Sequence, residues 1–178
     1  MLRRPLVPLL VAAPLALAAL TIHAPPARAS TFVETSVEET ARVADAVVRG
    51  KVLRTAARWV GGRIVTEAEI SVASAWKGDP GERIVVAVPG GRVGDLAQRV
   101  SGAPTFQADE EVVVFAARAG GGRWGVAGLA LGKYRVEAGQ ARPDLSGVRF
   151  ETRPLALGER PVGAMPVEEL ERRVRAVR

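Results

Sequence analysis

Apolar and polar side chains alternate with a period of two through most of the chain, a pattern that predicts β-strands. The longest alternation sets Ile64, Ala68 and Ile70 on one face and charged residues such as Glu67 on the other. At about 12 residues it suits a coiled strand that is shared between two halves of a barrel. Glycine and proline turns separate it from further predicted strands at 46–55, 83–88, 111–117, 123–129 and 133–137, with an edge strand at 148–152.

Helical spacing replaces this alternation near both ends of the chain. Ser36 and Glu39 fit a capping box, which predicts a short helix ending near residue 44. Pro166 suits the start of a second helix, over about 166–177, with acidic residues in its first turn and arginines in its last. Its apolar stripe, which includes Val167 and Leu170, predicts that this amphipathic helix packs on the strands.

Together these elements predict a mainly β fold. Five to six short antiparallel strands, with a short N-terminal helix and a C-terminal helix, indicate a small OB-like closed barrel of the oligonucleotide/oligosaccharide-binding type. A β-sandwich is the alternative architecture. Residues 92–106 show no sustained period, so we expect a long loop there.

The first 29 residues carry the three parts of a secretory signal peptide. Two arginines at positions 3 and 4 precede an apolar stretch over 6–22, and Ala27-Arg28-Ala29 offers the small residues that a signal peptidase reads. The alternative, an uncleaved membrane anchor, is disfavoured by two prolines and by the short apolar length. We therefore expect cleavage before Ser30 and one domain over 30–178, secreted or periplasmic, with no membrane span.

Composition narrows the possible chemistry of that exported domain. Cleavage would remove three arginines and no acidic residue, which lowers the net charge from +6 to +3, so we expect no nucleic-acid partner. The chain has no cysteine, and its one histidine, His23, lies in the predicted signal. We therefore expect no Cys/His metal site, no Cys or His nucleophile and no cofactor.

The remaining polar motifs do not assemble a predicted active site. Ser74 and Lys77 have the Ser-x-x-Lys spacing of penicillin-interacting enzymes, but they end a strand instead of opening a helix. Glu67 and Glu69 share a strand face with Arg63, as expected of a solvated outer surface. The sequence therefore predicts a protein that is not an enzyme, and a hydrolase is the weakest of the alternatives.

Short motifs in the first half of the chain resemble netrin-like modules. They are the stretch 44–52, which begins Ala44-Asp45-Ala46-Val47, the triplet 64–66, and Trp76-Lys77-Gly78-Asp79. In tissue inhibitors of metalloproteinases, a similar Ala-Asp-x-Val begins the first barrel strand and a Lys-Gly turn follows the second. Segments 101–106 and 128–134 are also similar to a set of bacterial secreted proteins. The resemblance implies an OB-type barrel and an inhibitor-like function.

One departure from those inhibitors concerns the N-terminus. Their N-terminal cysteine chelates the protease zinc, whereas cleavage here would leave Ser30-Thr31 with no cysteine. Because the α-amine of Ser30 could still coordinate a metal, the resemblance implies Ser30 and Thr31 as candidate partner contacts.

The segment 101–106 is the second candidate contact. It is polar, contains a proline and ends in a large aromatic side chain, and long loops in small domains tend to be functional. Ser101, Pro104, Thr105 and Phe106 are therefore candidate partner-binding residues, while the alternative for Phe106 is that it plugs the barrel end.

The sequence thus predicts a monomeric, exported, non-catalytic binding module. An inhibitor of an extracellular protease, or an accessory to one, is the first hypothesis. The alternative is a carbohydrate- or envelope-binding domain, which should place two aromatic side chains next to each other on one face.

Overall fold

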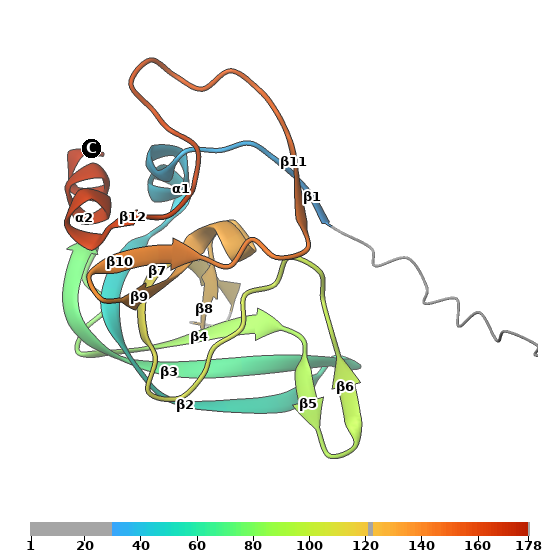
Figure 1. Cartoon of the computed structure of the whole chain (residues 1–178). Coiled ribbons are helices and arrows are strands. Elements are labelled where there is room, and N and C mark those ends of the chain that lie inside the picture. Colours follow the sequence, from blue (N-terminus) through green and yellow to red (C-terminus); the bar gives the residue numbers. More distant parts are fainter. Residues whose placement is uncertain (1–29, 121–122, 178) are drawn as a thin grey trace, which may run out of the picture.

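Strands dominate the computed structural model, which describes residues 30–120 and 123–177 (Figure 1). The predicted signal peptide and two glycines of the predicted turn at 120–122 lie outside the described residues. One sheet has eight strands in the order β12-β10-β9-β7-β2-β3-β4-β8. Its strands are β2 (Ala46–Val60), β3 (Arg63–Lys77), β4 (Arg83–Pro89), β7 (Glu111–Ala119), β8 (Arg123–Val126), β9 (Lys133–Glu137), β10 (Gln140–Pro143) and β12 (Met165–Pro166).

Two further pairs of strands stand apart from this sheet. β1 (Ser30–Val33) pairs in parallel with β11 (Val148–Glu151), and β5 (Gly91–Val93) forms an antiparallel hairpin with β6 (Leu96–Gln98). The helices are α1 (Val37–Val43) and α2 (Val167–Ala176), and a 3-10 helix, η2, spans Leu129–Gly132. The prediction of a mainly β fold with two helices is confirmed.

Both helices form where the sequence predicts them. The capping box of α1 is present: the Ser36 side chain accepts a hydrogen bond from the Glu39 backbone N–H at 3.0 Å, and the Glu39 carboxylate accepts one from the Ser36 N–H at 3.1 Å. The helices lie side by side in Figure 1. Arg173 on α2 donates two hydrogen bonds to the Glu38 carboxylate on α1, at 2.7 and 2.8 Å, and so links them.

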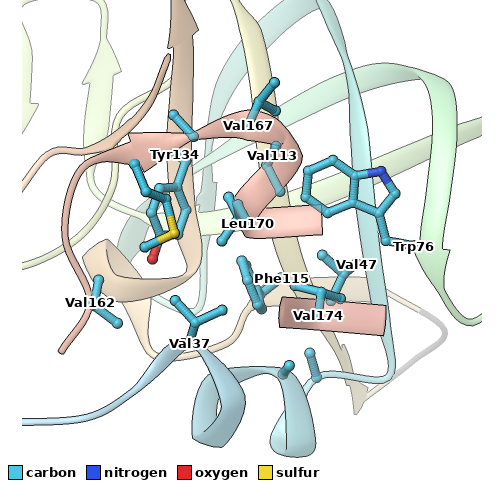
Figure 2. Close-up of a cluster of buried hydrophobic side chains, with 14 of the residues drawn as sticks. Val37, Val47, Trp76, Val113, Phe115, Tyr134, Val162, Val167, Leu170 and Val174 are labelled. Atoms are coloured by element: carbon cyan, nitrogen blue, oxygen red, sulfur yellow. The ribbon is translucent and has the colours of Figure 1, made fainter. Parts of the chain in front are cut away.

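The first half of β2 and most of β7 have both faces buried, because they separate two apolar clusters. Val47 and Phe115 belong to the outer cluster, which the two helices cover (Figure 2). Val48, which follows Val47 on β2, and Val114, which precedes Phe115 on β7, belong to the inner cluster. Side chains from β2, β3, β4, β7 and β8 fill that inner cluster, which explains the unbroken apolar run in β7.

The strand count and pairing differ from the expected five to six antiparallel strands. The large sheet alone has eight strands, and the pairs β4–β8 and β1–β11 are parallel. The expected loop at 92–106 contains most of the β5–β6 hairpin, whose strands are too short to show an alternating pattern. The strand expected at 123–129 stops at Val126, and η2 follows it. Among the described residues, no helix is both long and apolar enough to cross a membrane.

Candidate functional site

A groove of about 560 Å³ lies between the β5–β6 hairpin and the segment 99–106. The second half of β2, the start of β3 and the end of β4 also line it. The hairpin and the helices lie at opposite ends of the molecule (Figure 1). Sixteen residues line the groove: Thr55, Ala57, Thr66, Val88, Pro89, Gly90, Gly91, Arg92, Ala97, Gln98, Arg99, Val100, Ala103, Pro104, Thr105 and Phe106. We call it the hairpin groove.

Gly91 allows the hairpin to lie against the long β2–β3 ribbon. Its φ is +134°, and a Cβ at this position would lie 2.2 Å from the Thr66 hydroxyl oxygen and 3.1 Å from the Ala57 side chain. Only glycine fits both this backbone conformation and this approach. The sequence therefore places a Gly90-Gly91 pair where the chain leaves β4 and crosses the ribbon.

Hydrogen bonds then hold the hairpin in place. The Gln98 side chain accepts from the Ile64 backbone N–H at 2.9 Å, and the Gly90 N–H donates to the Ile64 carbonyl at 2.8 Å. The Thr66 hydroxyl donates to the Gly90 carbonyl at 2.7 Å. These contacts use both backbone groups of Ile64 and attach the hairpin to the start of β3.

Three of the six residues predicted from the sequence line this groove. Pro104 is buried, Thr105 is exposed, and Phe106 is only 7% exposed. Phe106 belongs to the inner cluster, as the plug hypothesis expects, yet it also forms part of the groove wall. A single side chain thus connects the interior of the protein with the groove.

The other three predicted residues lie on neighbouring segments. Ser30 and Ser101 are joined by two hydrogen bonds: the Ser30 N–H donates to the Ser101 hydroxyl at 3.0 Å, and the Ser30 hydroxyl donates to the Ser101 carbonyl at 2.8 Å. The Ser30 N–H also approaches the Gly147 carbonyl at 3.2 Å. Thr31 is exposed on β1. The two candidate segments, 71 residues apart, are therefore in contact.

A buried ion pair supports the groove wall from behind. Lys133 and Glu110 have side chains only 5% and 6% exposed, with 3.0 Å between the ammonium and the carboxylate. Arg135 also contacts Glu110, at 3.1 Å, and the Gln107 N–H donates to it at 2.9 Å. The Lys133 ammonium lies 5.3 Å from the centre of the Phe106 ring. Burial lowers the pKa of Lys133, and the Glu110 charge opposes that shift.

The charge of the groove is entirely positive. Arg92 and Arg99 are the charged residues among its lining, and neither makes an ion pair with any described residue. Both are exposed. An anion entering the groove would therefore meet two arginines and no carboxylate from the lining.

The acidic face of β3 is arranged differently. Glu67 pairs with Arg58, and Glu69 pairs with Arg54 at 2.6 Å and with Arg83 at 3.0 Å. The hydrogen bonds from these arginines lower the pKa of both carboxyls. Two ionised carboxylates whose charges are balanced by neighbouring arginines fit the outer face that the sequence predicts.

The penicillin-type spacing brings no reactive pair together. The Ser74 hydroxyl accepts from the Trp76 indole N–H at 3.1 Å, whereas the Lys77 ammonium donates to the Ala41 carbonyl at 2.7 Å, near the end of α1. Within residues 30–120 and 123–177, no group of three or more His, Cys, Asp or Glu side chains is placed to hold a metal ion.

The sequence reasoning missed Arg92 and Arg99. A signal for the hairpin is present, because Gly94-Asp95 is a two-residue connection of the type that joins antiparallel strands. Recognising it would have put the two arginines on one short hairpin. The chain matches no protein-family model, and no curated protein is significantly similar to it.

Proposed function

We propose that the chain is an exported, non-catalytic binding module, with a netrin-like OB barrel, that holds its partner in the hairpin groove. The observation that carries this proposal is the groove itself: a cavity of about 560 Å³ built around the segment 101–106. Its volume lies in the range typical of ligand sites.

The strand pairings support the barrel. β2 pairs with β3, β3 with β4, β4 with β8 in parallel, β8 with β7, and β7 again with β2. The side chains between these five strands form the inner cluster. Such a ring of five strands around one core is the arrangement expected of an OB-type barrel.

The lining of the groove supports binding over catalysis. Its polar side chains are threonine, glutamine and arginine, a set without a carboxylate or lysine to serve as general base. The Thr66 hydroxyl and the Gln98 carbonyl oxygen are already engaged with the backbone. The remaining polar side chains of the lining, which are two threonines and two arginines, can hold a ligand through hydrogen bonds and charge.

The inhibitor-like hypothesis is supported by the contact between Ser30 and Ser101. It joins the two segments that the sequence nominates into one continuous edge next to the groove. The Ser30 nitrogen donates hydrogen bonds to Ser101 and Gly147, so a partner would meet this edge as a surface on which that nitrogen is already engaged.

The carbohydrate hypothesis has less support. Sugar-binding sites stack rings on exposed aromatic side chains, and the aromatic residue among the groove lining, Phe106, is buried. Trp59 is 48% exposed on β2, two positions after the lining residue Ala57, but among the described residues the paired rings are the buried Phe115 and Tyr134. Trp124 is covered by the Arg118 guanidinium, 4.6 Å above its ring.

The test is partner capture with matched bulky substitutions. Protein expressed from the full-length sequence is used as bait against the secreted and envelope fraction of the producing organism, and bound proteins are identified by mass spectrometry. Ala97→Trp fills the groove from an exposed lining position, and Ala156→Trp adds the same side chain at an exposed position outside it.

We expect a partner that wild type and Ala156→Trp retain and Ala97→Trp loses. A partner that all three retain contradicts the groove as the binding site. A partner lost only by Thr31→Trp, on β1, would place the contact on the N-terminal edge instead.

A further inference from the structure

We infer that the hairpin groove binds an acidic peptide segment in an extended conformation, with Arg92 and Arg99 each pairing with a carboxylate. The inference rests on the proposed function and specifies the chemistry of the partner. It accounts for two arginines that the fold leaves unpaired at the wall of a cavity.

Half of the arginines in the part of the chain that the structure describes, nine of eighteen, are in ion pairs. Among the described residues, nine arginines contact a carboxylate within 4.0 Å: Arg42, Arg49, Arg54, Arg58, Arg83, Arg135, Arg153, Arg173 and Arg175. Arg92 and Arg99 are among the nine that do not, and they are the two that line the groove, whose lining contains no Asp or Glu. A bound carboxylate would therefore complete a pairing that the chain itself does not supply.

The register of the hairpin sets the spacing of the two charges. Arg92 lies directly opposite Ala97, and Arg99, the first residue after β6, follows Ala97 by two positions; all three residues line the groove. Diagonal neighbours of this kind lie about 7–8 Å apart. Carboxylates two residues apart on an extended peptide are separated by about 7 Å, which matches.

The rest of the groove suits the side chains between those carboxylates. Its walls are mostly small and apolar, from Ala57, Val88, Pro89, Ala103 and Pro104. An alternating acidic and apolar peptide would place its charges on the arginines and its apolar side chains against these walls. A uronic-acid polysaccharide has the charge, but it lacks the apolar side chains, and the lining of the groove contains no exposed aromatic ring.

The experiment measures binding to defined probes. The probes are an array of labelled heptapeptides that alternate Asp or Glu with Val or Ala, the same peptides with Asn or Gln at the acidic positions, and an oligogalacturonate. The protein is expressed from the full-length sequence, as wild type and as Arg92→Gln, Arg99→Gln and Arg142→Gln. Arg142 is an exposed arginine on β10, outside the groove, and makes no ion pair with a described residue, so it is the matched control.

We expect acidic peptides to bind and their amide counterparts to bind at least tenfold more weakly. Each of Arg92→Gln and Arg99→Gln should weaken the best acidic peptide about tenfold, since one charge-assisted hydrogen bond at a partly solvated site is lost. Arg142→Gln should leave the affinity unchanged. Equal urea midpoints would show that all four proteins are folded.

Three results would overturn the inference: no acidic peptide bound at millimolar concentration, equal binding of acidic and amide peptides, or equal loss in the control variant. Binding of oligogalacturonate alone would assign the groove to a polysaccharide and leave the proposed binding module in place. By contrast, a partner that Ala97→Trp still captures would remove the groove itself, whatever the peptides do.

Discussion

Removing the charge of Glu110 should destabilise the protein far more than removing the charge of its neighbour Glu111. In Glu110→Gln, the Lys133 ammonium, 5% exposed, loses the carboxylate 3.0 Å away and stays buried as a cation. Loss of one partner from a buried pair costs about 3–5 kcal/mol. Glu111 pairs with Arg49 at 2.6 Å, but both side chains are a third or more exposed, so Glu111→Gln should cost less than about 1 kcal/mol.

Urea unfolding followed by tryptophan fluorescence measures this difference, because Trp76 is 5% exposed in the outer cluster. With a slope of about 2 kcal/mol per M, Glu110→Gln should lower the midpoint by roughly 1.5–2.5 M. The double variant Glu110→Gln/Lys133→Met should recover most of the loss, since it leaves no buried charge.

The pH dependence gives an independent check on the same variant. Burial already lowers the pKa of Lys133, and without Glu110 the pKa falls further below its unfolded value. The unfolded chain then binds more protons than the folded one, so stability rises as the pH rises through the folded pKa toward about 10. A Glu110→Gln loss under 1 kcal/mol, or a double variant no more stable than the single one, would refute the buried-pair argument.

Three further predictions concern other parts of the fold. Arg153 holds the pKa of Glu39 at about 2, so the stability that this pair contributes is complete above about pH 4.5 and declines as the pH falls toward 2. Urea midpoints measured against pH should therefore fall less over this range in Arg153→Ala than in the wild type. Gly102→Ala should cost about 1–2 kcal/mol and speed amide exchange in β1, because φ is +74° and a Cβ would lie 2.7 Å from the Phe32 ring; unchanged exchange would contradict this. Tyr134→Phe removes a buried hydroxyl that has no partner among the described residues, so thermal unfolding should show equal stability or a gain of about 1 kcal/mol, and a clear loss would mean that the hydroxyl is bonded.

Local patterns allowed much of the secondary structure to be predicted from the sequence. The capping box at Ser36 needs only neighbouring residues, and the alternation in β3 reflects a strand with one face toward the inner cluster. The far end of β2 was missed for the opposite reason. Between Leu53 and Val60 nearly every side chain is at least partly exposed, so no apolar face marks the strand, and it ends five residues later than expected.

The groove could be predicted only in part. The segment 101–106 was identifiable as a long loop with an aromatic end, but the roles of Arg92 and Arg99 depend on how Gly91 positions the hairpin across the ribbon. The burial of Glu110 likewise depends on Lys133, 23 residues away in the sequence. The positions of these arginines and the burial of Glu110 arise from tertiary contacts, which the neighbouring residues in the sequence do not indicate.

The links between the two ends of the chain have a consequence for its synthesis. β1 pairs with β11, Ser36 bonds to Glu159 at a separation of 123 residues, and Glu38 bonds to Arg173 at a separation of 135. The first helix emerges early, but its contacts with the last helix form only when that helix exists, and contacts this distant in sequence form slowly. A chain interrupted before α2 would leave exposed the part of the outer cluster that Val167, Leu170 and Val174 cover, and proteases that recognise apolar surface could then distinguish unfinished copies from complete ones.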